Sequence, residues 1–422
     1  MSNNKDKNGA VKSNMKEDKN IKEAIMMIEK KVLYPSIATP ALLLDMDKLE
    51  ANIKEMSQLA ANAGVRLRPH VKIHESAVIS RMQIEAGACG VEVGPVAQAE
   101  GMVNEGIKVI KIAHPGFYGG PKGESLKRIL LNSDVKVTVV IDMIEQAEQI
   151  SQIGQALGRK VPVNIKIDTS AAGGSPRHGV QPDESALTLA KKVNQLPGVE
   201  VTGIYAHEMG AEATEKSLDS CAYKTLEITS NLAKMFKKAG VKVDDVSVGG
   251  SPQFRYTCKY RKEGKFPEVN EIHPGNCVIG SLMYWKAGGN KKENCALSML
   301  VTVMSTAHPD WFMIDAGYKA FSPDYLLGAM AEPDFFWDYK GNSLPSFGLV
   351  KGRPDLRAAI MSAESAQVFY MDPTKPKLHI GDRLEIIPNN STCAINIHDQ
   401  LYGVRKGLLE RVIPVTGRGK GN

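Results

Sequence analysis

Arg66-Leu-Arg-Pro-His-Val-Lys-Ile-His-Glu75 is the stretch of this chain from which its fold is best inferred. It places two arginines, two histidines, one lysine and one glutamate within ten residues, directly after an apolar, helix-like segment. A surface helix has no need of Pro69 here, and a core strand cannot bury so many charges unpaired. A strand-end lysine flanked by cations can have a lowered pKa, and its neutral amine can then attack an aldehyde. Lys72 is therefore a candidate Schiff-base lysine; the alternative is a basic loop without chemistry.

Strand-like and helix-like segments alternate along the first two thirds of the chain. The pattern predicts strands over residues 41–45, 65–71, 90–93, 109–113, 136–141, 163–168, 201–205 and 245–249, and helices that include 47–63, 76–86 and 95–105. Repeated βα units predict a parallel sheet, and eight of them would form a TIM barrel with its site at the carboxyl ends of the strands. That rule places Lys72, Asp168, His207 and the pair Gly249-Gly250 on one rim. An open, doubly wound sheet is the alternative.

The texture of the sequence changes after about residue 295. Short strand-like pieces with Gly, Pro and Asp turns follow, with little helix between them, and this spacing predicts an all-β domain. We therefore expect a polar leader over 1–34, disordered in its first 20 residues and able to join the β domain at its end. A barrel would then span 35–295, and a C-terminal β domain 296–422.

A second motif precedes the basic stretch and gives it a context. Tyr34-Pro-Ser-Ile-Ala-Thr-Pro-Ala-Leu-Leu-Leu-Asp45, taken with Arg68-Pro-His-x-Lys-x-His74, resembles the opening of the D-threonine aldolase and D-serine dehydratase family. That family belongs to the alanine-racemase-like enzymes that use pyridoxal 5'-phosphate (PLP), and the resemblance covers about residues 35 to 416. It implies a TIM-like (β/α)8 barrel that binds PLP, followed by a C-terminal β domain. It also implies that Lys72 carries PLP as a Schiff base.

The resemblance extends to further cofactor contacts. Ser247-Val-Gly-Gly-Ser-Pro252 is a Gly-rich turn whose backbone N–H groups can hold a phosphate, although by itself it reads equally as a plain βα turn. By resemblance, Gly249, Gly250 and Ser251 bind the PLP phosphate. Arg177 would lie beside the phenolic oxygen of the cofactor.

Three aromatic side chains complete the candidate set. Gly203-Ile-Tyr-Ala-His-Glu208 resembles the strand on which relatives present a histidine near the cofactor ring. His207 is thus a candidate for ring contact or proton transfer, with Tyr205 beside it as a cofactor contact, although a lone histidine is often structural. His70 of the basic stretch is a further candidate cofactor contact.

The C-terminal motif departs from the family. Gly381 to Asp399 follows the family's GDxxxxxPNHxCxTxNxxD stretch, in which metal-dependent members bind a divalent metal that grips the β-hydroxyl of the substrate. Asn390 and Thr392 stand where those members carry a histidine and a cysteine or aspartate. A neutral amide and a hydroxyl are poor donors to zinc or manganese, so we expect no metal at the usual position. A shifted site through Cys393 and His398 is the alternative.

Three reactions remain compatible with these residues. The first is a PLP-dependent lyase reaction, aldol cleavage or dehydration, on small D-configured 3-hydroxy amino acids. The second is a metal-independent racemase or epimerase, which needs only two bases beside the cofactor. The third is a non-catalytic PLP-binding protein, against which the large second domain argues because it would supply a closed site.

Bulk composition excludes several other classes of function. The chain has 422 residues, 43% hydrophobic and 24% charged, with a net charge of +6 and no basic stripe interleaved with aromatics, which argues against nucleic acid. No apolar run approaches the roughly 20 residues of a membrane span. Six scattered cysteines without a CxxC pair indicate reduced thiols and a cytoplasmic protein.

Asp315-Ala-Gly-Tyr-Lys-Ala-Phe-Ser322 resembles a family segment that walls the site across a dimer, so we expect a homodimer.

Overall fold

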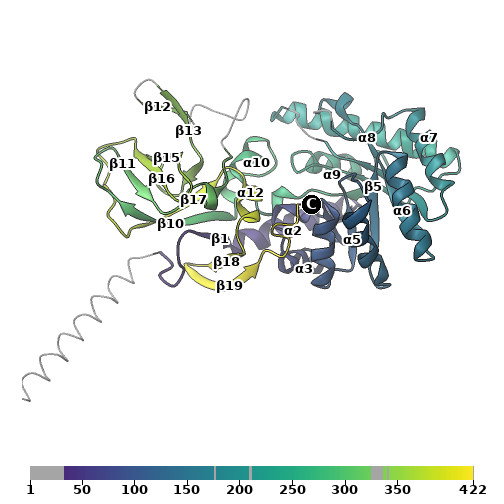
Figure 1. The fold of residues 1–422 in the computed structure, drawn as a ribbon. Helices are drawn as coiled ribbons and strands as arrows, with labels where there is room; N and C mark the ends of the chain where they lie inside the picture. Colours follow the sequence, from purple (N-terminus) through teal and green to yellow (C-terminus); the bar gives the residue numbers. More distant parts are fainter. Residues whose placement is uncertain (1–32, 175–176, 209–211, 325–335, 340–341, 422) are drawn as a thin grey trace, which may run out of the picture.

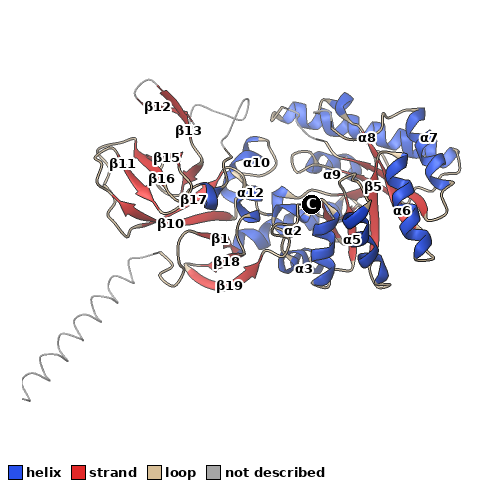
Figure 2. Cartoon of the chain, in the orientation of Figure 1, coloured by secondary structure: helices blue, strands red, loops and turns tan. Residues whose placement is uncertain are grey.

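The computed structural model describes residues 33–174, 177–208, 212–324, 336–339 and 342–421. The expected disordered leader lies outside them, as does nearly all of the segment 1–34. Figure 1 shows two parts side by side, one in which helices surround a parallel sheet and one built mainly of strands. Figure 2 shows the same division as blue helices around red strands on one side and mostly red strands on the other.

Eight parallel strands form the first sheet. Their order is β2-β9-β8-β7-β6-β5-β4-β3, and an isolated parallel bridge between His70 and Glu92 joins the two ends of the row. The sheet therefore closes as a (β/α) barrel, which confirms the predicted fold class. The strands are β2 (Arg66–Leu67), β3 (Val91–Val93), β4 (Val109–Ile112), β5 (Lys136–Ile141), β6 (Val161–Ile167), β7 (Val199–Ala206), β8 (Asp245–Val248) and β9 (Glu271–Ile272).

Amphipathic helices follow the strands and cover the barrel with their apolar faces. Local capping sets where several of them begin: the side chain of Asp183 accepts from Ser185 N, and that of Thr214 accepts from Ser217 N. The helices are α2 (Met46–Asn62), α3 (Ala77–Glu85), α4 (Val96–Asn104), α5 (Gly120–Leu131), α6 (Ile144–Ala156), α7 (Glu184–Asn194), α8 (Glu215–Lys238) and α9 (Phe254–Lys262).

Two predicted strands differ from the structure. The strand expected over 65–71 is confined to Arg66–Leu67, since Pro69 cannot donate to a ladder, and Lys72 lies in a 3-10 turn over Val71–Ile73. The strand expected first in the barrel series, β1 (Ala41–Asp45), lies in the other sheet. It pairs antiparallel with β10 and parallel with β18, which a period-based reading of one segment cannot distinguish from barrel pairing.

Nine strands form the second sheet, in the order β11-β16-β15-β14-β17-β10-β1-β18-β19, with every pair antiparallel except β1 and β18. This agrees with the predicted β domain, whereas the proposed boundary at residue 295 stays a prediction. The remaining strands are β10 (Leu297–Ser305), β11 (Trp311–Ile314), β14 (Gly348–Val350), β15 (Leu356–Met361), β16 (Ala366–Tyr370), β17 (Arg383–Pro388), β18 (Gln400–Arg405) and β19 (Leu408–Pro414), with β12 (Phe336–Tyr339) and β13 (Asn342–Pro345) forming a separate hairpin. Short helices α10 (Leu282–Lys286), α11 (Tyr318–Phe321) and α12 (Ser391–Asn396) lie between them.

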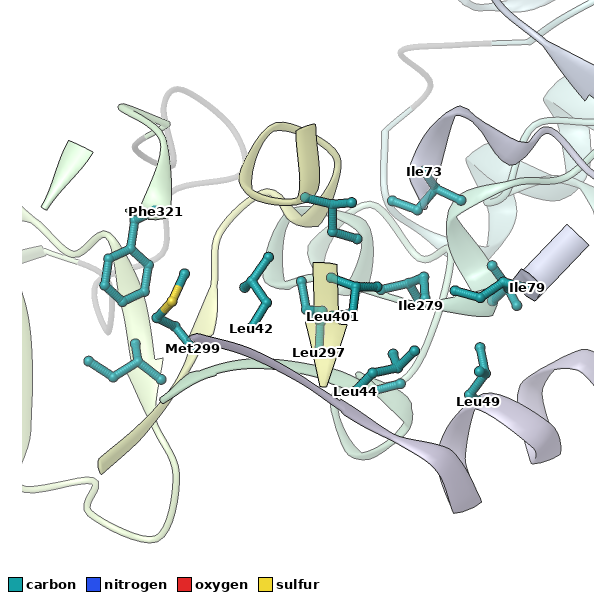
Figure 3. Close-up of a cluster of buried hydrophobic side chains, with 14 of the residues drawn as sticks. Leu42, Leu44, Leu49, Ile73, Ile79, Ile279, Leu297, Met299, Phe321 and Leu401 are labelled. Carbon is teal, nitrogen blue, oxygen red and sulfur yellow. The ribbon is translucent and has the colours of Figure 1, made fainter. Parts of the chain in front are cut away.

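One apolar core joins the two parts. Figure 3 shows Leu42 and Leu44 of β1 beside Leu297 of β10 and Leu401 of β18, with Leu49 of α2 continuing the cluster toward the barrel. The C-terminal end of the chain also returns to the barrel, where Gly417 N donates to the Glu75 carbonyl at 2.8 Å. This hydrogen bond ties the end of the chain to the barrel segment that carries Lys72. Among the described residues, no helix is long and apolar enough to cross a membrane.

Charge is buried inside the barrel as a paired cluster. Glu271 of β9 accepts from the Arg68 guanidinium at 3.0 and 3.1 Å and from the Lys111 ammonium of β4. Glu271 and Lys111 are fully buried, and the two cations hold the pKa of the Glu271 carboxyl far below its usual range against the effect of burial. The cluster ties β9 to the segment that follows β2.

Removing the anion of this cluster should destabilise the fold. We expect Glu271→Gln to lower the free energy of unfolding by about 3–5 kcal/mol, because it removes the carboxylate that pairs with buried Arg68 and leaves buried Lys111 only Asp245, at 3.7 Å. Urea denaturation followed by circular dichroism measures this. Glu263→Gln, which removes only the surface pair with Lys265, is the matched control and should change the midpoint little. An equal midpoint for both variants would contradict the proposed role.

Candidate active site

Lys72 lies at the carboxyl-end rim of the barrel and faces a cavity of about 200 Å³. The rim is where the loops after several parallel strands converge, and it is the place where barrel proteins bind ligands. The cavity lies between the barrel and the short helices α10 and α12. It is lined by His70, Lys72, Ile73, Arg177, His207, Glu208, Gly250, Ser251, Pro252, Gln253, His273, Gly275, Asn276, Met283, Tyr284, Ala287 and Thr392.

The electrostatics of the rim favour a neutral amine on Lys72. Burial lowers the pKa of this lysine, and the nearby charge of Arg177 lowers it further, while Glu92 opposes both effects. The sequence predicted this lowered pKa from the flanking cations. The structure shows that burial is the largest cause, which composition alone could not reveal.

Three aromatic rings are stacked beside the cavity. Tyr205 of β7 stacks on His273 with ring centroids 4.4 Å apart, and His273 stacks on His207 at 5.3 Å. His207 Nδ1 and His273 Nε2 lie 3.1 Å apart, and the other ring nitrogen of His273 lies 2.9 Å from Ser247 Oγ. Burial holds the pKa of both histidines well below the usual range, so both rings are neutral near pH 7.

A buried carboxyl group lies beneath this stack. Glu92 of β3 accepts a hydrogen bond from the Tyr205 hydroxyl at 2.8 Å, and its carboxylate lies 3.8 Å from His70 Nε2. Burial raises the pKa of Glu92 to about 8. Lys166 of β6, with its ammonium 4.8 Å from the centroid of the Tyr205 ring, has its pKa lowered by burial to about 8. Both groups therefore have pKa values close to neutral pH, so that small changes in pH alter their charges.

Two pairs of backbone N–H groups lie at the cavity, and each pair donates to one side-chain oxygen. Gly249 N and Gly250 N donate to the Glu208 carboxylate at 2.9 and 3.0 Å. Gly275 N and Asn276 N donate to Ser251 Oγ at 3.2 and 2.8 Å. We call these four N–H groups the cradle. Such concave arrays of N–H groups bind anions.

The glycines of the cradle are required by space. Gly249 has a φ of +108°, which side chains rarely tolerate. A Cβ on Gly250 would lie 2.7 Å from the Glu208 carbonyl oxygen, and one on Gly275 would lie 2.6 Å from the His70 carbonyl oxygen. The cradle therefore depends on close backbone approach.

The structure brings the candidate site residues of the sequence together. His70, Lys72, Arg177, His207, Gly250 and Ser251 line the cavity, Tyr205 lies below it, and Gly249 contributes its N–H. Asp168 does not join them, because its carboxylate accepts from Ser170 N and Gln181 Nε2 within its own loop. Their roles toward a cofactor stay predictions.

Sequence reasoning missed several residues of the same site. These are the lining residues Lys166, Glu208, His273, Asn276 and Tyr284, together with Glu92, which accepts a hydrogen bond from Tyr205. The motif Glu271-Ile-His-Pro-Gly-Asn276 contained the signal for two of them, since its first two residues form the barrel strand β9 and the rest follow it directly. Glu92 and Lys166 gave no signal, because an isolated charge within a strand indicates its partner only once the barrel closes.

The C-terminal motif reaches the cavity without a cluster of metal ligands. Asn390 caps α12 by accepting from Thr392 N at 3.0 Å, and the Thr392 hydroxyl lines the cavity. His398 Nε2 lies 3.0 Å from the Ala320 carbonyl oxygen, and Cys393 is exposed. In the part of the chain that the structure describes, no group of three or more His, Cys, Asp or Glu side chains could hold a metal ion.

A larger hollow of about 590 Å³ lies elsewhere, on the outer surface of α2 and α3. It is wide open, and its polar lining consists of solvated side chains such as Glu50, Lys54 and Glu85. Chemistry is better supported at the smaller, enclosed cavity, where buried titratable groups converge.

Comparisons with known proteins identify the family. Residues 44–282 match the family described as "Alanine racemase, N-terminal domain", and residues 296–404 match the "Putative serine dehydratase domain". The chain is 29% identical to a 3-hydroxy-D-aspartate aldolase of Paracoccus denitrificans (strain Pd 1222), over 91% of this chain and 93% of that protein. It is 30% identical to a D-threo-3-hydroxyaspartate dehydratase of Delftia sp. (strain HT23), over 87% of this chain and 94% of that protein.

A solved structure of a relative has the same fold. The D-threonine aldolase of Filomicrobium marinum superposes with a TM-score of 0.76 at 25% identity, covering 92% of this chain and 97% of that one. The chain therefore belongs to the alanine-racemase-like, PLP-dependent family of D-threonine aldolases and D-serine dehydratases, as the sequence motifs predicted.

The buried carboxyl under the site should be visible in the pH dependence of stability. The folded protein binds a proton on Glu92 more tightly than the unfolded chain does, because burial raises the folded-state pKa of Glu92 to about 8. This contribution to stability is fully present below the unfolded pKa of the group and is lost as pH rises through about 8. Glu92→Gln does not titrate. We expect the stability of this variant relative to wild type to rise by several kcal/mol between about pH 5 and about pH 8.

Urea denaturation at a series of pH values measures this difference. Glu105→Gln, at an exposed position, is the control and should follow wild type at every pH. A difference between Glu92→Gln and wild type that does not change with pH would show that Glu92 is ionised in the folded protein.

Proposed function

We propose that this protein is a PLP-dependent lyase that acts on small D-configured 3-hydroxy amino acids, by aldol cleavage or by dehydration. The observation that carries the proposal is the partly buried Lys72 amine of lowered pKa, which faces a cavity lined also by the N–H groups of the cradle. The relatives named as aldolases and dehydratases support the reaction class.

The residues of the cavity fit PLP. The cradle suits the phosphate, since its four N–H groups lie at the cavity where added Cβ atoms would clash, and Lys72 suits the aldehyde. The His207 ring suits contact with the pyridine ring, and Arg177 suits an oxyanion of the cofactor or the substrate carboxylate. When bound, PLP supplies an electron sink that stabilises negative charge at the Cα of an amino acid.

The side chains of the site supply the remaining functions. Burial lowers the pKa of the Lys72 amine and holds that of the His207 ring well below its usual range, which favours the neutral, proton-accepting form of each. Met283 and Tyr284 of α10 line the cavity and reduce its opening to solvent. Lysine and histidine are thus the candidate bases for the substrate Cα and β-hydroxyl.

A divalent metal does not fit the family's usual position here. Asn390 offers a neutral amide whose oxygen already accepts from Thr392 N, and Thr392 offers a neutral hydroxyl near Asn276 Nδ2. Neither is a strong donor to zinc or manganese. We infer that the β-hydroxyl is handled without a metal at these residues.

The reaction can be identified with one substrate screen. D- and L-forms of threonine, serine and 3-hydroxyaspartate are incubated with the PLP-loaded protein, and products are separated by chromatography. Glycine with an aldehyde indicates the aldolase, and a 2-oxo acid with ammonia indicates the dehydratase. Formation of the mirror-image amino acid alone would replace the lyase with a racemase, and no turnover at all would contradict an enzyme of this class.

The Lys72 amine should hold the cofactor covalently. We expect the purified protein with PLP to be yellow and to lose its visible band with borohydride, which fixes the cofactor to Lys72 in a tryptic peptide. Lys72→Ala should lack the band and lose activity by at least 10³-fold, as expected for loss of a covalent catalyst. Lys166→Ala is the control for the labelling alone, since it removes another buried lysine of lowered pKa and should keep the visible band and the label on Lys72. Labelling on any residue other than Lys72 would overturn the assignment.

Metal dependence provides an independent prediction. We expect elemental analysis to find no stoichiometric zinc or manganese, and EDTA to leave turnover unchanged, because the usual ligands are absent. The double change Asn390→His with Thr392→Cys should create zinc binding. A tightly held metal in the wild-type protein, with loss of activity on chelation, would favour the shifted site through Cys393 and His398.

We infer in addition that the protein is a cytoplasmic homodimer. All six cysteines are free, four of them buried, which suits a reducing compartment. Tyr318 and Lys319 of α11 are exposed beside α12, where a partner subunit could complete the wall of the cavity. Light scattering after size exclusion measures the mass; a monomer at micromolar concentration would contradict the dimer.

A further inference from the structure

Glu208 places a carboxylate in the cradle itself. It follows β7 and is 2% exposed, and one of its oxygens accepts from both Gly249 N and Gly250 N. Its other oxygen, Oε1, is buried without a hydrogen-bond partner among the described residues. The cradle therefore satisfies only one of the two oxygens of this buried carboxylate.

The surroundings of Glu208 offer little else to hold its charge. In the described part of the chain, no ion pair includes Glu208. Cys221 faces it from α8, and Tyr205 and His207 precede it on its own segment. Across the cavity stand Lys72, Arg177 and His273. Burial raises the pKa of the Glu208 carboxyl to about 7, while the hydrogen bonds from the two glycines lower it.

We infer that Glu208 competes with the PLP phosphate for the N–H groups of Gly249 and Gly250, so that PLP binds with protonation of this carboxylate. The inference rests on the proposed cofactor and deepens it. A phosphate dianion and a glutamate carboxylate need the same two N–H groups, and two anions cannot share a buried site without a large cost. The carboxylate must therefore take up a proton and release the two N–H groups when the phosphate enters.

The proton has a definite consequence for affinity. Below about pH 7 the Glu208 carboxyl is largely neutral and therefore weakens phosphate binding little. Above it, each further pH unit should weaken the phosphate contribution by up to tenfold, because binding then takes up one proton. The second ionisation of a phosphate monoester, near pH 6, is complete in this range and does not obscure the effect.

Pyridoxal, which lacks the phosphate, isolates this effect from the chemistry at Lys72. Both ligands present the same aldehyde, so the ratio of their dissociation constants reports the cradle alone. We expect titrations followed by absorbance to show, for wild type, a loss of at least tenfold in the advantage of PLP over pyridoxal between about pH 7 and about pH 9. Glu208→Gln keeps the acceptor without the charge and should show a constant advantage.

Two further variants bound the result. Glu208→Ala empties the cradle of its side chain and should bind PLP more tightly than wild type at about pH 9, even if Glu208→Gln folds poorly. Glu105→Gln, which removes an exposed carboxylate, should reproduce wild type. Calorimetry in buffers of different ionisation enthalpy should find close to one more proton taken up by wild type than by Glu208→Gln on binding PLP at about pH 8.

The outcomes separate this inference from the cofactor assignment. If wild type and Glu208→Gln show the same pH profile and the same proton uptake, Glu208 is a structural acid and the inference is wrong while PLP stands. If neither PLP nor pyridoxal binds to wild type, the proposed cofactor itself is wrong and the inference falls with it.

Discussion

The site depends on one buried ion cluster. Glu271 on β9 pairs with Arg68 and Lys111, and this cluster fixes the segment after β2 at the point where the barrel closes. Because β2 and β9 are each only two residues long, backbone pairing alone gives that closure little strength. The same segment then turns at Pro69 and carries Lys72 onto the rim. Loss of the cluster would therefore shift the backbone of this segment and, with it, the position of Lys72 at the cavity.

Above this cluster, the protein buries more ionisable groups than a structural core needs. Glu92, Lys166 and Glu208 lie within or just below the rim, and burial moves the pKa of each toward neutrality. Buried ionisable groups cost stability, and clusters of them with shifted pKa values are typical of functional sites. Their positions around one enclosed cavity, with neutral histidines between them, are what a site requires that must bind an anion and also transfer protons.

The sequence predicted the barrel, the second β domain, the family and the rim position of Lys72, because each left a local signal. Period-2 and helical patterns indicated the elements, and the unusual composition of 66–75 indicated the lysine. The placement of β1 was wrong because its apolar run suits either sheet. Glu92, His273 and Glu208 were not predicted as site residues, since their partners lie more than 40 residues away in the chain and only the closed barrel brings them together.

A structure determined at high resolution with PLP bound would test the central claim, that this rim holds the cofactor between Lys72 and the cradle. The account predicts continuous density from Lys72 Nζ to the cofactor, with the phosphate on the N–H groups of Gly249, Gly250, Gly275 and Asn276. Density for the phosphate at another part of the cavity, or a cofactor that is not joined to Lys72, would contradict it.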